Sequence, residues 1–315
     1  MEQGNKPLLA NMNYFSQTLT LLGIVLICWS LFLVLSITLC KSLFNINFLE
    51  VNVLSQLSFP PVLNSLKILQ ILNTIGMFVL PPFIFAFVVE RRALNYLQLN
   101  RSARLASFVF TALIMFAAIP LINWMGELNS LLKLPESLST IEKWMKEAEE
   151  NAAKVTLVFL NMKSTGEFAI NFLMIAILPA FGEELLFRGA ILRIIRGWSK
   201  NAHVAIWVTA ILFSAMHMQF YGFLPRMMMG VFFGYLLLWS GSLWLPVCAH
   251  FVNNGAAVIF AYFNEKEIMH IDTDKIGTGE QSSLVVIFSV IIVLSFLYII
   301  RTLETRRNNS VLMES

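Results

Sequence analysis

The chain has 315 residues, of which 57% are hydrophobic and only 13% are charged. Soluble domains average about 25% charged residues, so this composition excludes an ordinary soluble protein and predicts a chain that crosses a membrane several times. The net charge of +3 is small. No basic tract of the kind that binds nucleic acid occurs, and the positive charge instead favours contact with a lipid bilayer.

Apolar stretches long enough to cross a bilayer recur along the whole chain. Because about 20 residues span the hydrocarbon core, we predict an all-α polytopic membrane protein with about eight transmembrane helices, the fifth and sixth being short. The predicted spans are Leu19–Leu39, Ile68–Val89, Leu105–Ile122, Phe168–Ile195, Val204–Met216, Leu224–Trp239, Leu243–Tyr262 and Leu284–Ile300.

The loops that carry arginine and lysine indicate the orientation. These residues follow the second, fourth and last predicted spans, at Arg91, Arg92, Arg101, Arg104, Arg193, Arg196, Lys200, Arg301, Arg306 and Arg307. Positively charged loops stay in the cytoplasm. We therefore expect a multi-pass protein with both termini cytoplasmic, in the plasma membrane of a prokaryote.

Four regions follow from this topology. Residues 1–123 hold three N-terminal transmembrane helices, and residues 124–166 form an outer loop. In that loop Ser139-Thr140-Ile141-Glu142 is typical of a capping box that starts an amphipathic helix on the membrane surface, although a helix packed there without a function fits equally well. Residues 167–263 form the predicted catalytic core, and residues 264–315 hold an outer loop with Asp272 and Asp274, the last transmembrane helix and a cytoplasmic tail.

The fourth predicted span contains two adjacent glutamates, Glu183 and Glu184, and an arginine, Arg188. An ionised side chain at the centre of a spanning helix costs about 2.5–3.5 kcal/mol, so such residues usually face a polar interior and mark function. Glu184 and Arg188 stand at i, i+4 and are predicted to form a structural ion pair. Glu183 points about 100° away and stays available for chemistry.

Further polar residues occur in two other spans, at His217 and at His250 with Asn254 one turn later. Leaving each unpaired in hydrocarbon is unfavourable, so we expect them to converge with the glutamates. Glu183 and His217 each lie 14 residues from the short loop that joins their spans. At 1.5 Å per residue both lie roughly 21 Å from it, and they are expected to meet inside the membrane.

This set of residues suits peptide-bond hydrolysis. Glu183 with His217 can activate a water, Glu184 completes the catalytic set while paired with Arg188, and the side chains of His250 and Asn254 could donate hydrogen bonds to the oxyanion. The sequence has no HExxH zinc motif, no aspartate in any predicted span and no GxSxG serine motif. The usual zinc, aspartyl and serine protease chemistries therefore have no motif here.

In chain order, Glu183-Glu184-x-x-x-Arg188, Phe213-x-x-x-His217 and His250-x-x-x-Asn254 resemble the three motifs of the CPBP family. These are the CAAX-processing and bacteriocin-processing intramembrane proteases, also called the Abi family. The resemblance covers about Phe168 to Phe263. It implies a helical bundle like that of the CAAX prenyl endopeptidase, catalysis by Glu183 and His217 without a cofactor, and an oxyanion site at His250 and Asn254.

The resemblance leaves two matters open. The family was first described as metalloproteases, so zinc held by Glu183, His217 and His250 is an alternative. The implied substrate is a membrane protein or peptide, lipidated or not.

A non-catalytic membrane scaffold or immunity protein of the same fold is the second hypothesis for the function. A proton-coupled transporter is a third, which the scarcity of polar residues in the first three spans disfavours.

Overall fold

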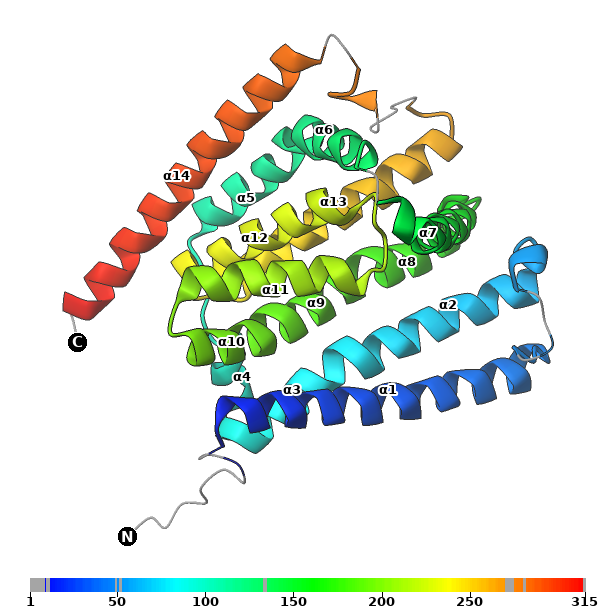
Figure 1. Ribbon diagram of the computed structural model, residues 1–315, viewed down its shortest axis with the longest axis horizontal. Helices are drawn as coiled ribbons and strands as arrows, with labels where there is room; N and C mark the ends of the chain where they lie inside the picture. The colour runs from blue at the N-terminus through cyan, green and yellow to red at the C-terminus, as the bar shows by residue number, and fades with distance from the viewer. Residues whose placement is uncertain are drawn as a thin grey trace.

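The computed structural model describes residues 9, 12–48, 50, 53–132, 135–269, 275–279 and 282–313, and within these ranges it contains helices and no strand (Figure 1). The predicted all-α class is therefore confirmed. Asp272 and Asp274 of the predicted outer loop lie outside the described residues. The α-helices are α1 (Tyr14–Phe44), α2 (Pro60–Thr74), α3 (Leu80–Glu90), α4 (Ala93–Tyr96), α5 (Leu105–Ala117), α6 (Ile119–Ser130), α7 (Ser139–Leu160), α8 (Thr165–Asn171), α9 (Leu178–Glu184), α10 (Leu192–Ser199), α11 (Ala202–Met216), α12 (Phe223–Ser240), α13 (Trp244–Glu265) and α14 (Ser283–Met313).

Several consecutive helices join into long apolar rods. Three π-helical segments, Ile75–Val79, Phe172–Ile177 and Leu185–Ile191, link α2 to α3, α8 to α9 and α9 to α10. The resulting rods Pro60–Glu90 and Thr165–Ser199 are each long enough to cross a bilayer.

The predicted number of spans is not confirmed. Among the described residues, 6 helices are long and apolar enough to cross a membrane, and the pair α5 and α6 makes a seventh if it counts as one bent span. This pair bends by 46° because Pro120, the second residue of α6, supplies no backbone N–H. The predicted fifth span corresponds to α11, whose 15 residues fall short of the roughly 20 that a span needs.

Figure 1 shows α1 beside the rod of α2 and α3 on one side of the bundle and α14 at the opposite edge. The rod of α8 to α10 lies between, next to α11, α12 and α13. The start of α1 and the end of α14 lie at the same end of the bundle as α4, and α7 lies at the other end. A buried apolar core that includes Phe85, Leu185 and Phe213 joins α1 and α3 to the central helices.

The outer-loop helix exists, but it starts differently from the prediction. α7 begins at Ser139 with Leu138 as its N-cap and no side-chain capping bond, so the predicted capping box at Ser139 is wrong. A capping box forms instead at the start of α8, where the Ser164 hydroxyl accepts from the Glu167 N–H and Glu167 accepts from the Ser164 N–H. The apolar residues Ile141 and Trp144 of α7 are exposed.

The pair Gly230 and Gly234 sets the distance between α11 and α12. A Cβ at Gly230 would lie 3.0 Å from the Ala210 Cβ, and one at Gly234 would lie 2.8 Å from Ile206. These two glycines form a GxxxG face on which α11 packs closely. Its consequence for the site is that the Gly230 carbonyl comes within reach of the rod that carries the glutamates.

The sidedness of the bundle remains a prediction with a direct test. We expect a cysteine at Arg101, beside α4, to react with an impermeant thiol reagent only from the cytoplasmic side. A cysteine at the exposed Glu150 of α7 should react from outside, because the arginine-rich loops stay in the cytoplasm. Labelling of intact cells and of opened membranes, in a chain whose three native cysteines are replaced, measures this. Rapid labelling of position 101 from outside would contradict the orientation.

Candidate active site

The site is built on the middle of the α8–α10 rod, where the backbone departs from regular helix. Glu183 and Glu184 end α9, with π-helical segments on both sides of that helix. Single π-turns in helices occur frequently at functional sites. Pro179 stands four residues before Glu183 and has no N–H to donate to the Ile175 carbonyl, which is therefore free for another partner.

Glu184 and Arg188 form the predicted ion pair. The Arg188 Nη1 lies 2.9 Å from the Glu184 Oε1, and both side chains are fully buried. Arg188 also donates from Nη2 to the Gly230 carbonyl at 3.0 Å, and its guanidinium carbon lies 4.6 Å from the centre of the Phe213 ring. One guanidinium thus ties the glutamate rod to α12 and packs on an aromatic ring of α11.

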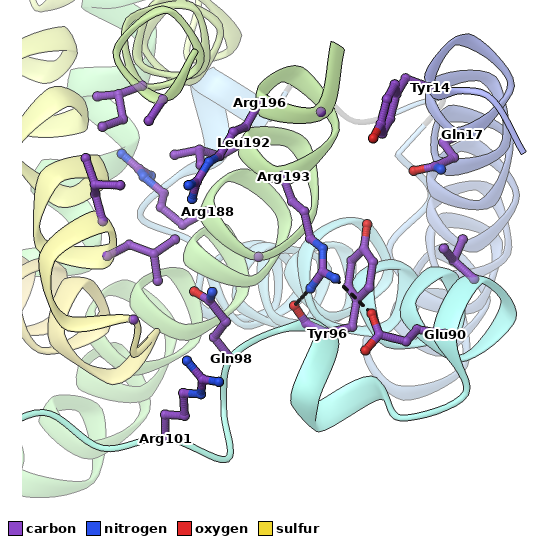
Figure 2. Close-up of a pocket in the computed structure, with 18 of the residues that line it drawn as sticks. Tyr14, Gln17, Glu90, Tyr96, Gln98, Arg101, Arg188, Leu192, Arg193 and Arg196 are labelled. Carbon is purple, nitrogen blue, oxygen red and sulfur yellow. Dashed lines mark hydrogen bonds and ion pairs between the residues drawn. The ribbon is translucent and has the colours of Figure 1, made fainter. Parts of the chain in front are cut away.

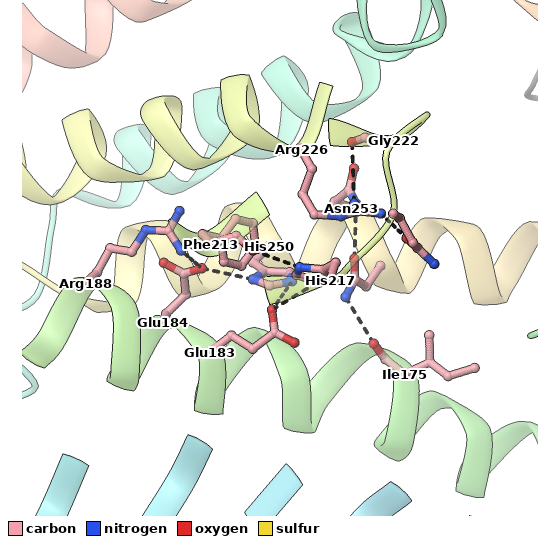
Figure 3. Close-up of polar contacts among 12 residues, drawn as sticks. Ile175, Glu183, Glu184, Arg188, Phe213, His217, Gly222, Arg226, His250 and Asn253 are labelled. Carbon is pink, nitrogen blue, oxygen red and sulfur yellow. Dashed lines mark hydrogen bonds and ion pairs between the residues drawn. The ribbon is translucent and has the colours of Figure 1, made fainter. Parts of the chain in front are cut away.

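His250 is oriented by this ion pair. Its Nδ1 lies 2.9 Å from the Glu184 Oε1, which also binds Arg188. Because an ionised carboxylate only accepts, the Nδ1 carries the proton. The other ring nitrogen, Nε2, lies 4.0 Å from the Glu183 Oε2 (Figure 3).

His217 reaches the same carboxylate from α11. Its Nδ1 lies 2.8 Å from the Phe213 carbonyl, which can only accept, so in the neutral ring Nε2 carries the lone pair. That nitrogen lies 3.9 Å from the Glu183 Oε2. The structure therefore brings Glu183, His217 and His250 together. A water at about 2.8 Å from each of two atoms fits across such a gap.

Asn254 is bonded to the backbone of the rod and to its neighbour in the chain. Its amide Nδ2 donates to the Ile175 carbonyl at 3.1 Å, the carbonyl that Pro179 leaves free, and its Oδ1 accepts from Asn253 at 3.1 Å. The side chains of His250 and Asn254 therefore point to separate partners in this structure. Pro246, the other proline near the site, lies in the first turn of α13.

A further set of polar residues, which the sequence analysis did not predict, surrounds the turn that follows α11. Arg226, in the first turn of α12, lies within electrostatic range of Glu183 and Glu149, and it donates to the Gln219 side chain at 2.5 Å. Glu149 of α7 accepts from the Tyr221 N–H at 3.0 Å, and Asn129 of α6 accepts from the Leu224 N–H at 2.8 Å. Arg226 could have been predicted from the sequence, because a lone charged residue inside the predicted span Leu224–Trp239 is itself unusual.

The residues proposed as zinc ligands do not have the spacing that zinc requires. Two histidine nitrogens and a carboxylate are suitable donors in type. Bonds of 2.0–2.1 Å would place tetrahedral donors about 3.3 Å apart, whereas the gaps from Glu183 to the histidines are 3.9 and 4.0 Å. Within the described ranges, no group of three or more His, Cys, Asp or Glu side chains is arranged to hold a metal ion.

Comparison with known proteins concerns the part of the chain that carries this site. The apolar helices indicate an integral membrane protein, and residues 165–256 match the family of type II CAAX prenyl endopeptidase Rce1-like proteins. That segment contains the three motifs, so the match supports the CPBP family and points to a CAAX-type protease. An uncharacterized protein, YpbD, of Bacillus subtilis (strain 168) is 27% identical over 84 residues, which cover 25% of this chain and 40% of YpbD. No solved structure matches the chain.

We expect the two glutamate–arginine ion pairs among the described residues to differ sharply in their contribution to stability. Replacing either Glu184 or Arg188 by alanine strands a buried charge and should lower the free energy of unfolding by about 3–5 kcal/mol. Glu90 pairs with Arg193 at the same 2.9 Å but is 38% exposed, so Glu90→Ala should cost about 0–1 kcal/mol. Unfolding of the three purified variants in detergent measures the difference, and equal losses at Glu184 and Glu90 would contradict it.

Proposed function

We propose that this protein is an intramembrane endopeptidase in which Glu183, with His217, activates a water for attack on a peptide carbonyl. The observation that supports this best is the convergence of both histidine Nε2 atoms on one carboxylate, 3.9 and 4.0 Å from the Glu183 Oε2. Glu183 is 13% exposed and His217 is 27% exposed, so part of each side chain is accessible. The proposal requires that water and a peptide segment enter at this exposed part.

The proposed reaction uses each side chain for one step. A water donates its two protons in hydrogen bonds to Glu183 and to the His217 Nε2, which leaves an oxygen lone pair to attack the carbonyl carbon. Glu183 takes one proton as the new C–O bond forms. It then passes that proton to the amide nitrogen as the C–N bond breaks, which gives a carboxylic acid and an amine.

Stabilisation of the oxyanion requires side chains of the site to change their hydrogen bonds. His250 holds the Glu184 carboxylate through Nδ1, and in its doubly protonated form the Nε2–H would donate to the oxyanion. Asn254 joins as a second donor only if its amide exchanges the Ile175 carbonyl for the oxyanion. The proposed substrate is a membrane-associated or lipidated protein or peptide, since only such a chain has ready access to a site between apolar helices.

The proposal predicts which substitutions remove activity; Glu183→Gln and His217→Ala should keep the fold, while His250→Ala should also lose some stability because His250 satisfies the buried Glu184. Glu183→Gln, His217→Ala and His250→Ala should each lower peptide cleavage by roughly 10²–10⁴-fold, because each removes a group that acts on the water or the oxyanion. Cleavage of a panel of lipidated and unlipidated membrane peptides by protein in proteoliposomes measures this, alongside the thermal midpoint.

Matched controls lie outside the cluster. His203 is exposed and hydrogen-bonds the Tyr235 hydroxyl at 2.8 Å, and Glu142 of α7 is partly exposed. The variants His203→Ala and Glu142→Gln should therefore keep wild-type cleavage. If Glu183→Gln cleaves as fast as Glu142→Gln, the proposed base is wrong. If the wild type cleaves no peptide of the panel, the non-catalytic scaffold is favoured.

The metal alternative has a separate test. Cleavage should survive prolonged dialysis against a chelator, because the proposed base acts on water directly and the Glu183–histidine gaps are wider than zinc bonds allow. Activity and zinc content are measured before and after dialysis. Loss of activity that added zinc restores would establish the metalloenzyme instead.

A further inference from the structure

A polar cavity lies along the same rod, on the side of the ion pair away from Glu183. Its volume is about 1030 Å³, and it is bounded by α10, the start of α1, the end of α12 and the loop between α4 and α5. In Figure 2, Gln98 and Arg101 enter from that loop, and Arg188 and Arg196 from the rod. The cavity is distinct from the proposed catalytic cluster, because neither Glu183 nor either histidine of that cluster lines it.

The wall of this cavity is strongly basic. Five cationic side chains line it, Arg101, Arg188, Arg193, Arg196 and Lys200, against a single carboxylate, Glu90. Arg193 already binds Glu90 at 2.9 Å and the Tyr96 carbonyl at 2.8 Å. Burial raises the pKa of the Tyr96 hydroxyl to about 12, so that side chain adds no negative charge.

Three of these cations have no compensating acid. Within the described residues, no carboxylate lies within 4 Å of the side chains of Arg101, Arg196 or Lys200. Arg101 lies over Gly241, which ends α12 with φ of +62° and presents no side chain between the guanidinium and the cavity. Lys200 lies 4.9 Å from the centre of the Tyr14 ring. The unbalanced positive charge is therefore available to an anion.

We propose that this cavity binds a phosphate group, contacted by Arg101 and Arg196. Guanidinium groups suit phosphate because their paired N–H donors match its oxygens, and arginines from separate segments can approach several faces of the tetrahedral anion. The phosphate belongs either to the headgroup of an anionic lipid or to a soluble phosphate compound.

The test titrates two probes against the thermal midpoint of the purified protein in phosphatidylcholine nanodiscs. One arm adds phosphatidylglycerol to the bilayer, and the other adds inorganic phosphate to the buffer. The variant Arg101→Gln/Arg196→Gln removes two exposed cations of the cavity wall, and Arg92→Gln/Arg301→Gln removes the same charge from exposed positions outside it.

A probe that binds the folded protein raises its midpoint. We expect the wild type and the control variant to respond equally, and the cavity variant to bind about tenfold more weakly for each contact removed. A response to the lipid alone identifies a headgroup site, a response to phosphate alone identifies a soluble ligand, and a response to both identifies the shared chemistry. If neither probe raises the wild-type midpoint, or if the two variants respond alike, the proposal is wrong.

Discussion

The ion pair between Glu184 and Arg188 is the interaction on which the rest of this site depends. Both side chains are fully buried, so neither can exchange its partner for water. The cost of removing two charges from water is offset only when further hydrogen bonds satisfy them. Arg188 meets this condition through the Gly230 carbonyl, and Glu184 through the His250 Nδ1. These requirements hold α12 and α13 against the rod that carries both glutamates.

The adjacent Glu183 gains its environment from the same arrangement. With His250 fixed by Glu184, the free nitrogen of that ring lies toward Glu183, and the Phe213 carbonyl turns His217 in the same direction. The same phenylalanine packs its ring against the Arg188 guanidinium and so links the two sets of residues. Structure and proposed function are thus coupled, because residues that satisfy a buried charge also aim the two imidazoles.

Most of this site can be predicted from the sequence, because a charged residue in an apolar span must find a partner inside the protein. The convergence of Glu183 and His217 follows from equal distances to a shared loop, and the Glu184–Arg188 pair follows from helical periodicity. Other features depend on tertiary contacts. The partner of Asn254 is the Ile175 carbonyl, freed by a proline on another helix. The start of α7 and the length of α11 likewise depend on packing that local pattern does not encode.

The measurement that tests the organising role of this ion pair most directly is a double-mutant cycle on unfolding. Glu184→Gln and Arg188→Gln are made singly and together, and the free energies of unfolding are compared in one detergent. We expect the double variant to lose less stability than the two single losses combined, with a coupling free energy of about 0.5–3 kcal/mol. If the losses simply add, Glu184 and Arg188 do not stabilise each other, and the buried pair does not organise the site.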